Sequence, residues 1–159
     1  MVKMTIHATI CYIIKDGKVL LLKKSKGRFG EGKWNAPGGK IKLGEDPVEC
    51  AIREVFEETG LRINDVKKHG VIDYYFGTKS EPTWTVHIFS TNSFQGELKP
   101  SDEGILKWVN LNELPYEEMW EDDRHWVPLL LEDKKFKAEF YFDNQANVLL
   151  DHRVEEVSS

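Results

Sequence analysis

The sequence predicts an α/β domain in which a mixed β-sheet lies between helices. Three observations support this fold class: strand-like segments outnumber helical ones, two longer helices are expected, and the length suits one hydrophobic core. We therefore expect a single domain over residues 1–159. Only the last few residues, which end with Val157-Ser158-Ser159, resemble a loose tail.

The chain begins with a predicted β-hairpin. Met4 to Ile14 is rich in β-branched and aromatic residues, Asp16-Gly17 is a strong turn signal, and Val19 to Leu22 returns as the second strand. The next segment is a glycine-containing loop, expected to be mobile, that is either solvated surface or an attractor of polyphosphate. Its basic residues are Lys23, Lys24, Lys26, Arg28 and Lys33.

A loop and one helix are predicted between Gly39 and Leu61. Asp46 suits the N-cap, Pro47 the first helical position, and Glu49 the acidic position of a capping box. Gly60 suits the position just past the helix end. One face of this helix should be buried, and its members are Val48, Ala51, Ile52 and Val55.

The remaining elements are mostly strands. Alternating or β-branched segments predict strands, and turn residues separate them. A helix is expected over Asp123 to Asp133, where Pro128 leaves the start uncertain. The predicted strands are Val71 to Phe76, Thr85 to Phe89, Leu106 to Val109, Phe136 to Phe142, and Val148 to Leu150.

Composition excludes several classes of protein. The chain is 40% hydrophobic and 31% charged, as ordinary soluble domains are, and its net charge of −5 argues against binding a nucleic-acid polymer. Cys11 and Cys50 are expected to be small buried hydrophobes in a reducing compartment. Because no apolar run of about 18 residues and no signal-peptide start occur, we expect a cytoplasmic protein with no membrane partner.

Three carboxylates share one face of the first predicted helix. Glu54, Glu57 and Glu58 stand at spacings of three and four residues, where like charges repel. They are either a solvated acidic face or the ligands of a divalent cation. All-oxygen ligands favour Mg²⁺, with Mn²⁺ as a substitute, over zinc.

The spacing from Gly39 to Leu61 resembles the Nudix box without a departure. The constrained positions are Gly39, Glu45, Arg53, Glu54, Glu57, Glu58, Gly60 and Leu61. The resemblance implies a Nudix-type α/β/α sandwich and a Mg²⁺-dependent hydrolase of nucleoside diphosphate derivatives. It also implies that Glu54, Glu57 and Glu58 bind metal, that Arg53 orients them, and that Gly38 offers its carbonyl to the metal.

The wider chain is similar to the oxidised-purine nucleoside triphosphatase branch of that family, the 8-oxo-dGTP diphosphatase or MutT-like enzymes. The similar segments are Gly32-Lys33-Trp34-Asn35, Val86-His87-Ile88-Phe89, Ser101-Asp102-Glu103, Met119-Trp120-Glu121-Asp122-Asp123 and Trp126-Val127-Pro128-Leu129-Leu130-Leu131. The resemblance makes Glu103 a further metal ligand or general base, with Glu57 as the other candidate base. The substrate-binding candidates are Lys24, Phe29, Asn35, Lys40, Tyr74, Trp84, Trp120, Asp122 and Asp123.

These residue types suit a pocket for a purine base. The Asn35 amide can read a base edge, and Trp120 can stack on a base, although Asn35 could also serve only the following turn. Asp122 and Asp123 are adjacent acids, so one of them could hold a proton in a dry pocket, or they could only cap a helix.

Two positions depart from the family pattern. Trp84 is bulkier than the side chain typical there, and Tyr74 adds a hydroxyl where an apolar ring is typical. The predicted function is hydrolysis of an oxidised purine nucleoside triphosphate, 8-oxo-dGTP first, to a monophosphate and pyrophosphate, for nucleotide-pool cleansing. The alternatives are another substrate (an unmodified NTP, ADP-ribose or a dinucleoside polyphosphate) or a nucleotide-binding regulator that does not hydrolyse.

Overall fold

The computed structural model describes residues 4–99 and 101–158. Its helices are α1 (Pro47–Thr59), α2 (Asp123–Leu131) and two short 3-10 turns, η1 (Leu111–Glu113) and η2 (Tyr116–Glu118). Its strands are β1 (Ile6–Lys15), β2 (Lys18–Lys24), β3 (Trp34–Asn35), β4 (Gly38–Lys40), β5 (Arg62–Asn64), β6 (Lys67–Phe76), β7 (Trp84–Thr91), β8 (Ser93–Gln95), β9 (Gly104–Asn110), β10 (Lys135–Phe142) and β11 (Leu149–Val157).

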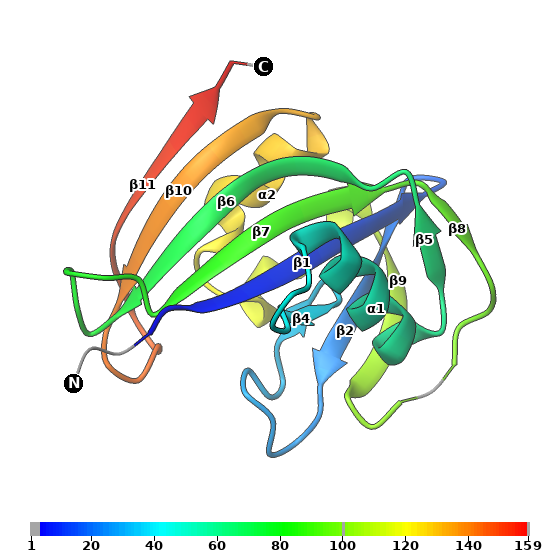
Figure 1. Cartoon of the computed structure of the whole chain (residues 1–159), viewed down its shortest axis with the longest axis horizontal. Helices are drawn as coiled ribbons and strands as arrows, with labels where there is room; N and C mark the ends of the chain where they lie inside the picture. The colour runs from blue at the N-terminus through cyan, green and yellow to red at the C-terminus, as the bar shows by residue number, and fades with distance from the viewer. Residues whose placement is uncertain (1–3, 100, 159) are drawn as a thin grey trace.

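The main sheet is mixed, as predicted. Within the described residues its strand order is β11-β10-β6-β7-β1-β2-β3, with β4 paired to β1 and β9 paired to β2 (Figure 1). The pairs β1–β7 and β6–β10 are parallel, and the other pairs are antiparallel. A small second sheet joins β5 to β8.

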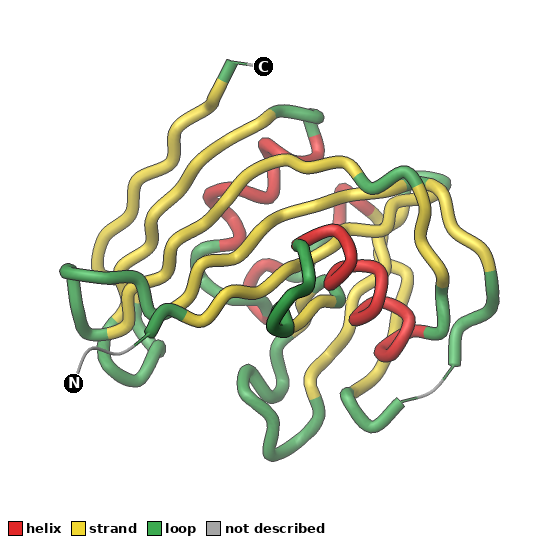
Figure 2. Tube along the Cα trace, in the orientation of Figure 1, coloured by secondary structure: helices red, strands yellow, loops and turns green. Residues whose placement is uncertain are grey.

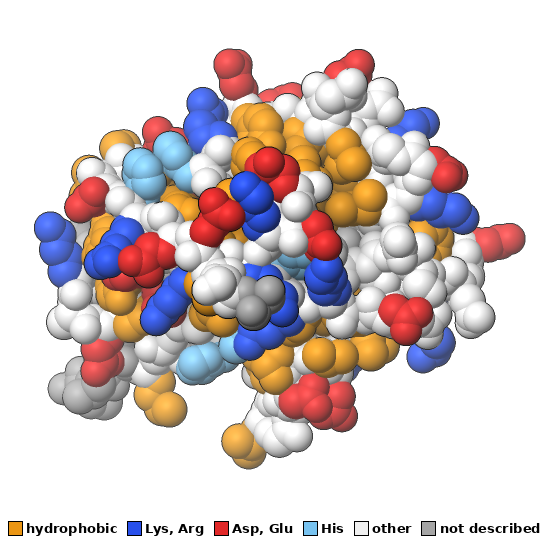
Figure 3. Space-filling model, turned by 90° about the horizontal axis from the view of Figure 1, so that it is seen from above, with side chains coloured by type: hydrophobic (Ala, Val, Ile, Leu, Met, Phe, Trp, Pro, Cys, Tyr) orange, Lys and Arg blue, Asp and Glu red, His pale blue; other side chains and the backbone are white. Residues whose placement is uncertain are grey.

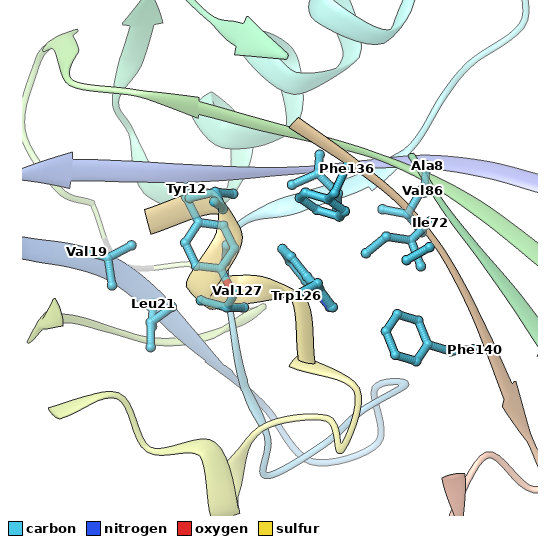
Figure 4. Packing of buried hydrophobic residues seen from close by; sticks show 14 of the residues in the cluster. Ala8, Tyr12, Val19, Leu21, Ile72, Val86, Trp126, Val127, Phe136 and Phe140 are labelled. Atoms are coloured by element: carbon cyan, nitrogen blue, oxygen red, sulfur yellow. The ribbon is translucent and has the colours of Figure 1, made fainter. Parts of the chain in front are cut away.

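Helices cover the two faces of the sheet, which confirms the α/β/α sandwich (Figure 2). On one face α2 packs Trp126, Val127 and Leu130 into a cluster with Tyr12 and Phe140 (Figure 4). On the other face α1 packs against β1 and β4, and the buried cluster there includes Cys11, Ile13, Leu20, Ala51 and Val55. None of the described helices is long and apolar enough to cross a membrane.

The ends of α1 are as predicted. The Asp46 carboxylate accepts from the Glu49 N–H, and the Glu49 carboxylate accepts from the Asp46 N–H. Gly60 ends the helix at φ +84°, a left-handed conformation that glycine adopts without strain. These caps fix where α1 begins and ends, and therefore where its acids lie along the helix axis.

The predicted buried face of α1 is partly wrong. Ala51 and Val55 are buried, but Val48 is exposed and Ile52 only partly buried. The buried stripe centres on Ala51 and Glu58, which leaves Val48 at its edge at about 100° per residue. The sequence places a carboxylate, Glu58, within that stripe, and this burial matters for the site.

Several elements begin or end at other residues than predicted. Val157 belongs to β11, so the predicted loose tail is wrong there, and Ser159 lies outside the described residues. Lys23 and Lys24 are part of β2 rather than of the basic loop. The short strands β3, β4, β5 and β8 have two or three residues each, too few to show alternation. Cys11 and Cys50 are buried and free, as expected.

Charge is mixed on the face seen in Figure 3. Lysine and arginine side chains are interspersed with aspartate and glutamate, and orange hydrophobic side chains lie between them. This face therefore lacks a continuous basic stripe of the kind that follows a nucleic-acid backbone.

Candidate active site

A cavity of about 530 Å³ opens between the sheet, the loop after β2 and the segment before α2. Of the predicted site residues, Arg53, Glu57 and Asp122 do not line it. The other predicted residues do: Lys24, Phe29, Asn35, Gly38, Lys40, Glu54, Glu58, Tyr74, Trp84, Glu103, Trp120 and Asp123. The fold thus brings together residues from six separate stretches of the sequence.

Arg53 organises the acids of α1 from outside the cavity. Its guanidinium donates to both carboxylate oxygens of Glu45, at 2.8 and 3.0 Å, and to the Lys40 carbonyl at 3.1 Å. Its Nη1 also donates to Glu54 at 2.8 Å and to Glu57 at 3.3 Å. The paired arginine lowers the pKa of Glu45 to about 2. Arg53 therefore holds Glu54 and Glu57 in place.

Glu54 lies directly against Gly39 of β4. A Cβ atom on Gly39 would stand 2.4 Å from the Glu54 carboxyl carbon, so a larger residue at this position would displace the Glu54 carboxylate. Glu57 is more open, because about half of its side chain (52%) is exposed. The two acids that Arg53 binds thus differ, since Glu54 faces the cavity and Glu57 faces solvent.

Glu58 is the buried acid of the cluster, with 2% of its surface exposed. Its Oε1 accepts from the Gly38 N–H at 2.8 Å, and its Oε2 lies 3.4 Å from the Lys24 Nζ. Burial raises the pKa of Glu58 to about 7, against the opposing charge of Lys24. Lys24 also lies 3.8 Å from Glu103, which pairs with Arg28 at 3.1 Å.

The acids fit a divalent cation by their chemistry. Glu54, Glu57, Glu58 and Glu103 supply only oxygen donors, as Mg²⁺ and Mn²⁺ require. In the part of the chain that the structure describes, no three acids surround one point closely enough to hold an ion. Lysine and arginine side chains pair with them instead. The pKa of Glu58 is raised although Lys24 lies beside it, which indicates that this lysine compensates the negative charge of the acids only in part.

Aromatic rings form the other end of the cavity. The Phe29 ring is stacked on two tryptophan rings, with ring centroids 6.0 Å from Trp84 and 5.3 Å from Trp120. Lys33 lies over the Trp120 ring and Lys40 over the Trp84 ring, at 5.3 and 5.6 Å. Aromatic rings with lysine cations beside them suit an aromatic base attached to phosphates.

Asn35 and Asp122 are the polar residues of this end whose hydrogen bonds bear on their predicted roles. Asn35 Oδ1 accepts from the Ala36 N–H at 2.8 Å, so the side chain does take part in the following turn while also lining the cavity. The helix-cap interpretation of Asp122 is wrong, because its side chain makes no capping bond. Its Oδ2 instead accepts from the Tyr74 hydroxyl at 2.7 Å and from the Trp126 indole N–H at 2.8 Å.

Sequence reasoning missed two residues of the base end. Trp126 lies in a segment similar to the family and in the helix expected over Asp123 to Asp133, but neither pattern signals its bond to Asp122. Phe76 lines the cavity beside Tyr74. The alternation of β6 carries that signal, since residues two apart share one face of a strand.

Comparisons with known proteins agree with this architecture. The model of the NUDIX domain matches residues 4–130. The chain is 38% identical to the "oxidized purine nucleoside triphosphate hydrolase" of Danio rerio over 149 residues, which cover 94% of each chain. The enzyme of that name from Mus musculus is 38% identical over 151 residues, 95% of each. A MutT protein from Bacillus halodurans superposes with a TM-score of 0.84, at 28% identity, covering 94% of this chain and 97% of that one.

Proposed function

This chain belongs to the Nudix hydrolase family, and from that premise we propose that it is a Mg²⁺-dependent nucleoside triphosphate pyrophosphohydrolase. It hydrolyses oxidised purine nucleotides, 8-oxo-dGTP first, to a nucleoside monophosphate and pyrophosphate. Such an enzyme would act in the cytoplasm and cleanse the nucleotide pool. The relatives named for this activity match nearly the whole chain, which supports the proposal.

One observation carries the proposal: a single cavity has an acidic end and an aromatic end. Glu54, Glu58 and Glu103 line one part of the 530 Å³ space, and Trp84 and Trp120 line another. A nucleoside triphosphate has the same division, since its triphosphate binds metal and its base stacks. A volume of about 300–1,000 Å³ is usual for sites that take small molecules.

The chain's own residues supply positioning and proton transfer. Lys24 and Arg28 lie beside Glu58 and Glu103, where they can attract the triphosphate from solvent. We propose that Glu54, Glu57, Glu58 and Glu103 would hold Mg²⁺, with Mn²⁺ as a substitute. The bound ion would neutralise phosphate charge and acidify a water molecule. Glu103 lines the cavity and Glu57 does not, which favours Glu103 as the base that takes the proton of the attacking water.

A substrate panel tests this proposal. We would compare kcat/KM with Mg²⁺ for 8-oxo-dGTP, dGTP, ADP-ribose and a dinucleoside polyphosphate, and would identify the phosphate product. Pyrophosphate release that requires Mg²⁺, with 8-oxo-dGTP at least about tenfold better than dGTP, is expected. Binding without hydrolysis, or a clear preference for ADP-ribose, would show that the proposed function is wrong.

A further inference from the structure

The Asp122 carboxylate is held by two uncharged donors from different elements. Tyr74 comes from β6 and Trp126 from α2, and both donate to the same oxygen, Oδ2, at 2.7 and 2.8 Å. Hydrogen bonds donated to a carboxylate favour its ionised form. This side chain therefore has a structural reason to carry the negative charge even though only 1% of Asp122 is exposed.

The remaining oxygens of the aspartate pair point to one shared proton. Asp122 Oδ1 and Asp123 Oδ2 are buried and have no hydrogen-bond partner among the described residues. Leaving buried polar atoms unpaired is costly, and adjacent buried carboxyls do not readily ionise together. A single proton on the pair removes the repulsion between two negative charges and supplies one donor.

The surroundings indicate which carboxyl carries that proton. Burial raises the pKa of both acids, and the charge of Asp122 raises the pKa of Asp123 further, well above its usual range. The bonds from Tyr74 and Trp126 counter the rise for Asp122 alone. The other titratable groups near Asp123 are Tyr12 and Tyr116, and Lys33 is the cation that favours its ionised form.

We propose that Tyr74 is a positioning residue that keeps Asp122 ionised and thereby places the proton of the pair on Asp123. Asp123 is the member of the pair that lines the cavity. It then donates a hydrogen bond to the base. Donation selects a purine that offers a carbonyl or ring nitrogen at that point over one that offers an amino group. This inference rests on the proposed function, because it specifies how the base end reads its substrate.

The first test needs no substrate. The whole protein is labelled with carboxyl-¹³C aspartate, the signals are assigned with Asp122→Asn and Asp123→Asn, and the carboxyl shifts are followed with pH. In the wild type we expect Asp123 protonated and Asp122 ionised at neutral pH. Tyr74→Phe removes only the hydroxyl and should raise the pKa of Asp122, so that the proton is shared between both carboxyls.

The matched control is Tyr75→Phe. Tyr75 is the next residue of β6, stacks on Tyr141 at 4.6 Å and does not line the cavity. Its loss should leave both aspartate titrations unchanged. An ionised Asp123 at neutral pH in the wild type would overturn the inference, and so would identical titrations in Tyr74→Phe and wild type.

The second test reads selectivity. We would measure the ratio of kcat/KM for 8-oxo-dGTP, a 6-oxopurine, to that for 2-oxo-dATP, a 6-aminopurine. Tyr74→Phe should lower this ratio roughly tenfold, mainly through KM, and Tyr75→Phe should not. An unchanged ratio in Tyr74→Phe would overturn the selective role. If neither nucleotide is hydrolysed, the proposed function fails, and the titration still decides where the proton lies.

Discussion

The two ends of the cavity compensate negative charge in different ways. At the acidic end Glu54, Glu58 and Glu103 pair with arginine or lysine. At the aromatic end the negative charge of Asp122 is stabilised by two uncharged donors, the Tyr74 hydroxyl and the Trp126 indole N–H. Cations can be exchanged for a metal ion, whereas uncharged donors keep Asp122 ionised and leave the single proton of the aspartate pair on Asp123. The first arrangement suits phosphate chemistry and the second suits recognition of a base.

The largest expected effect concerns the acidic end. Glu58→Gln and Glu57→Gln should each lower kcat by about 10²–10³-fold or more on every nucleotide, because each removes one charge from the acids proposed to bind the metal. Glu113→Gln, at an exposed acid in η1, is the control. Melting temperatures establish that the variants fold. Near-wild-type kcat for either variant at saturating Mg²⁺ would remove that residue from the proposed site.

The next effect concerns the aromatic end. Asp123→Ala should lower kcat/KM for 8-oxo-dGTP by about 10–100-fold, since the base loses a buried hydrogen bond. The Mg²⁺ concentration that gives half-maximal kcat should not change. Asp123→Asn keeps an N–H donor and should lose much less. If the alanine variant alters the Mg²⁺ requirement, the two ends are not separate.

Stacking gives a smaller and less selective effect. Trp120→Ala should weaken kcat/KM by about tenfold for all bases alike, because every base has a face on which an aromatic ring can stack. Parallel assays with purine and pyrimidine triphosphates measure this. A loss confined to oxidised purines would mean that Trp120 reads the base edge rather than its face.

The smallest expected effect is on stability at the acidic end. Arg53 lowers the pKa of Glu45 from 4.5 to about 2. The stability that ionised Glu45 adds to the fold is therefore fully present above pH 4.5 and is lost as the pH falls through about 2. Glu45→Gln should cost about 1–2 kcal/mol of unfolding free energy at neutral pH and almost nothing near pH 2. Denaturant unfolding across this range measures it, with Glu31→Gln as an exposed control. A deficit independent of pH would contradict the ionic origin.

The two ends also differ in how far the sequence predicts them. The placement of Arg53, Glu54, Glu57 and Glu58 on one helix could be predicted from the sequence, because the caps of that helix are local. The burial of Glu58 was not predicted, since it depends on how α1 is rotated against the sheet. Helix periodicity predicts which residues share a face but does not specify how the helix is rotated against the sheet.

The grouping of the aromatic-end residues into one site depended on the resemblance. Its residues come from the loop after β2, from β6 and β7, and from the start of α2, so no single stretch carries a spacing signal. The bonds from Tyr74 and Trp126 to Asp122 join residues 48 positions apart and four positions apart. The first of these contacts follows from sheet topology, which local patterns do not specify.

The most direct test of the division between the two ends is the binding of 8-oxo-dGMP, which has the base but no pyrophosphate. Isothermal titration calorimetry should give a Kd that changes by less than about twofold between Mg²⁺ and a chelator, and between wild type and Glu58→Gln. Asp123→Ala should weaken binding roughly tenfold. Binding that requires Mg²⁺ or Glu58, or that is unaffected by Asp123→Ala, would contradict the account.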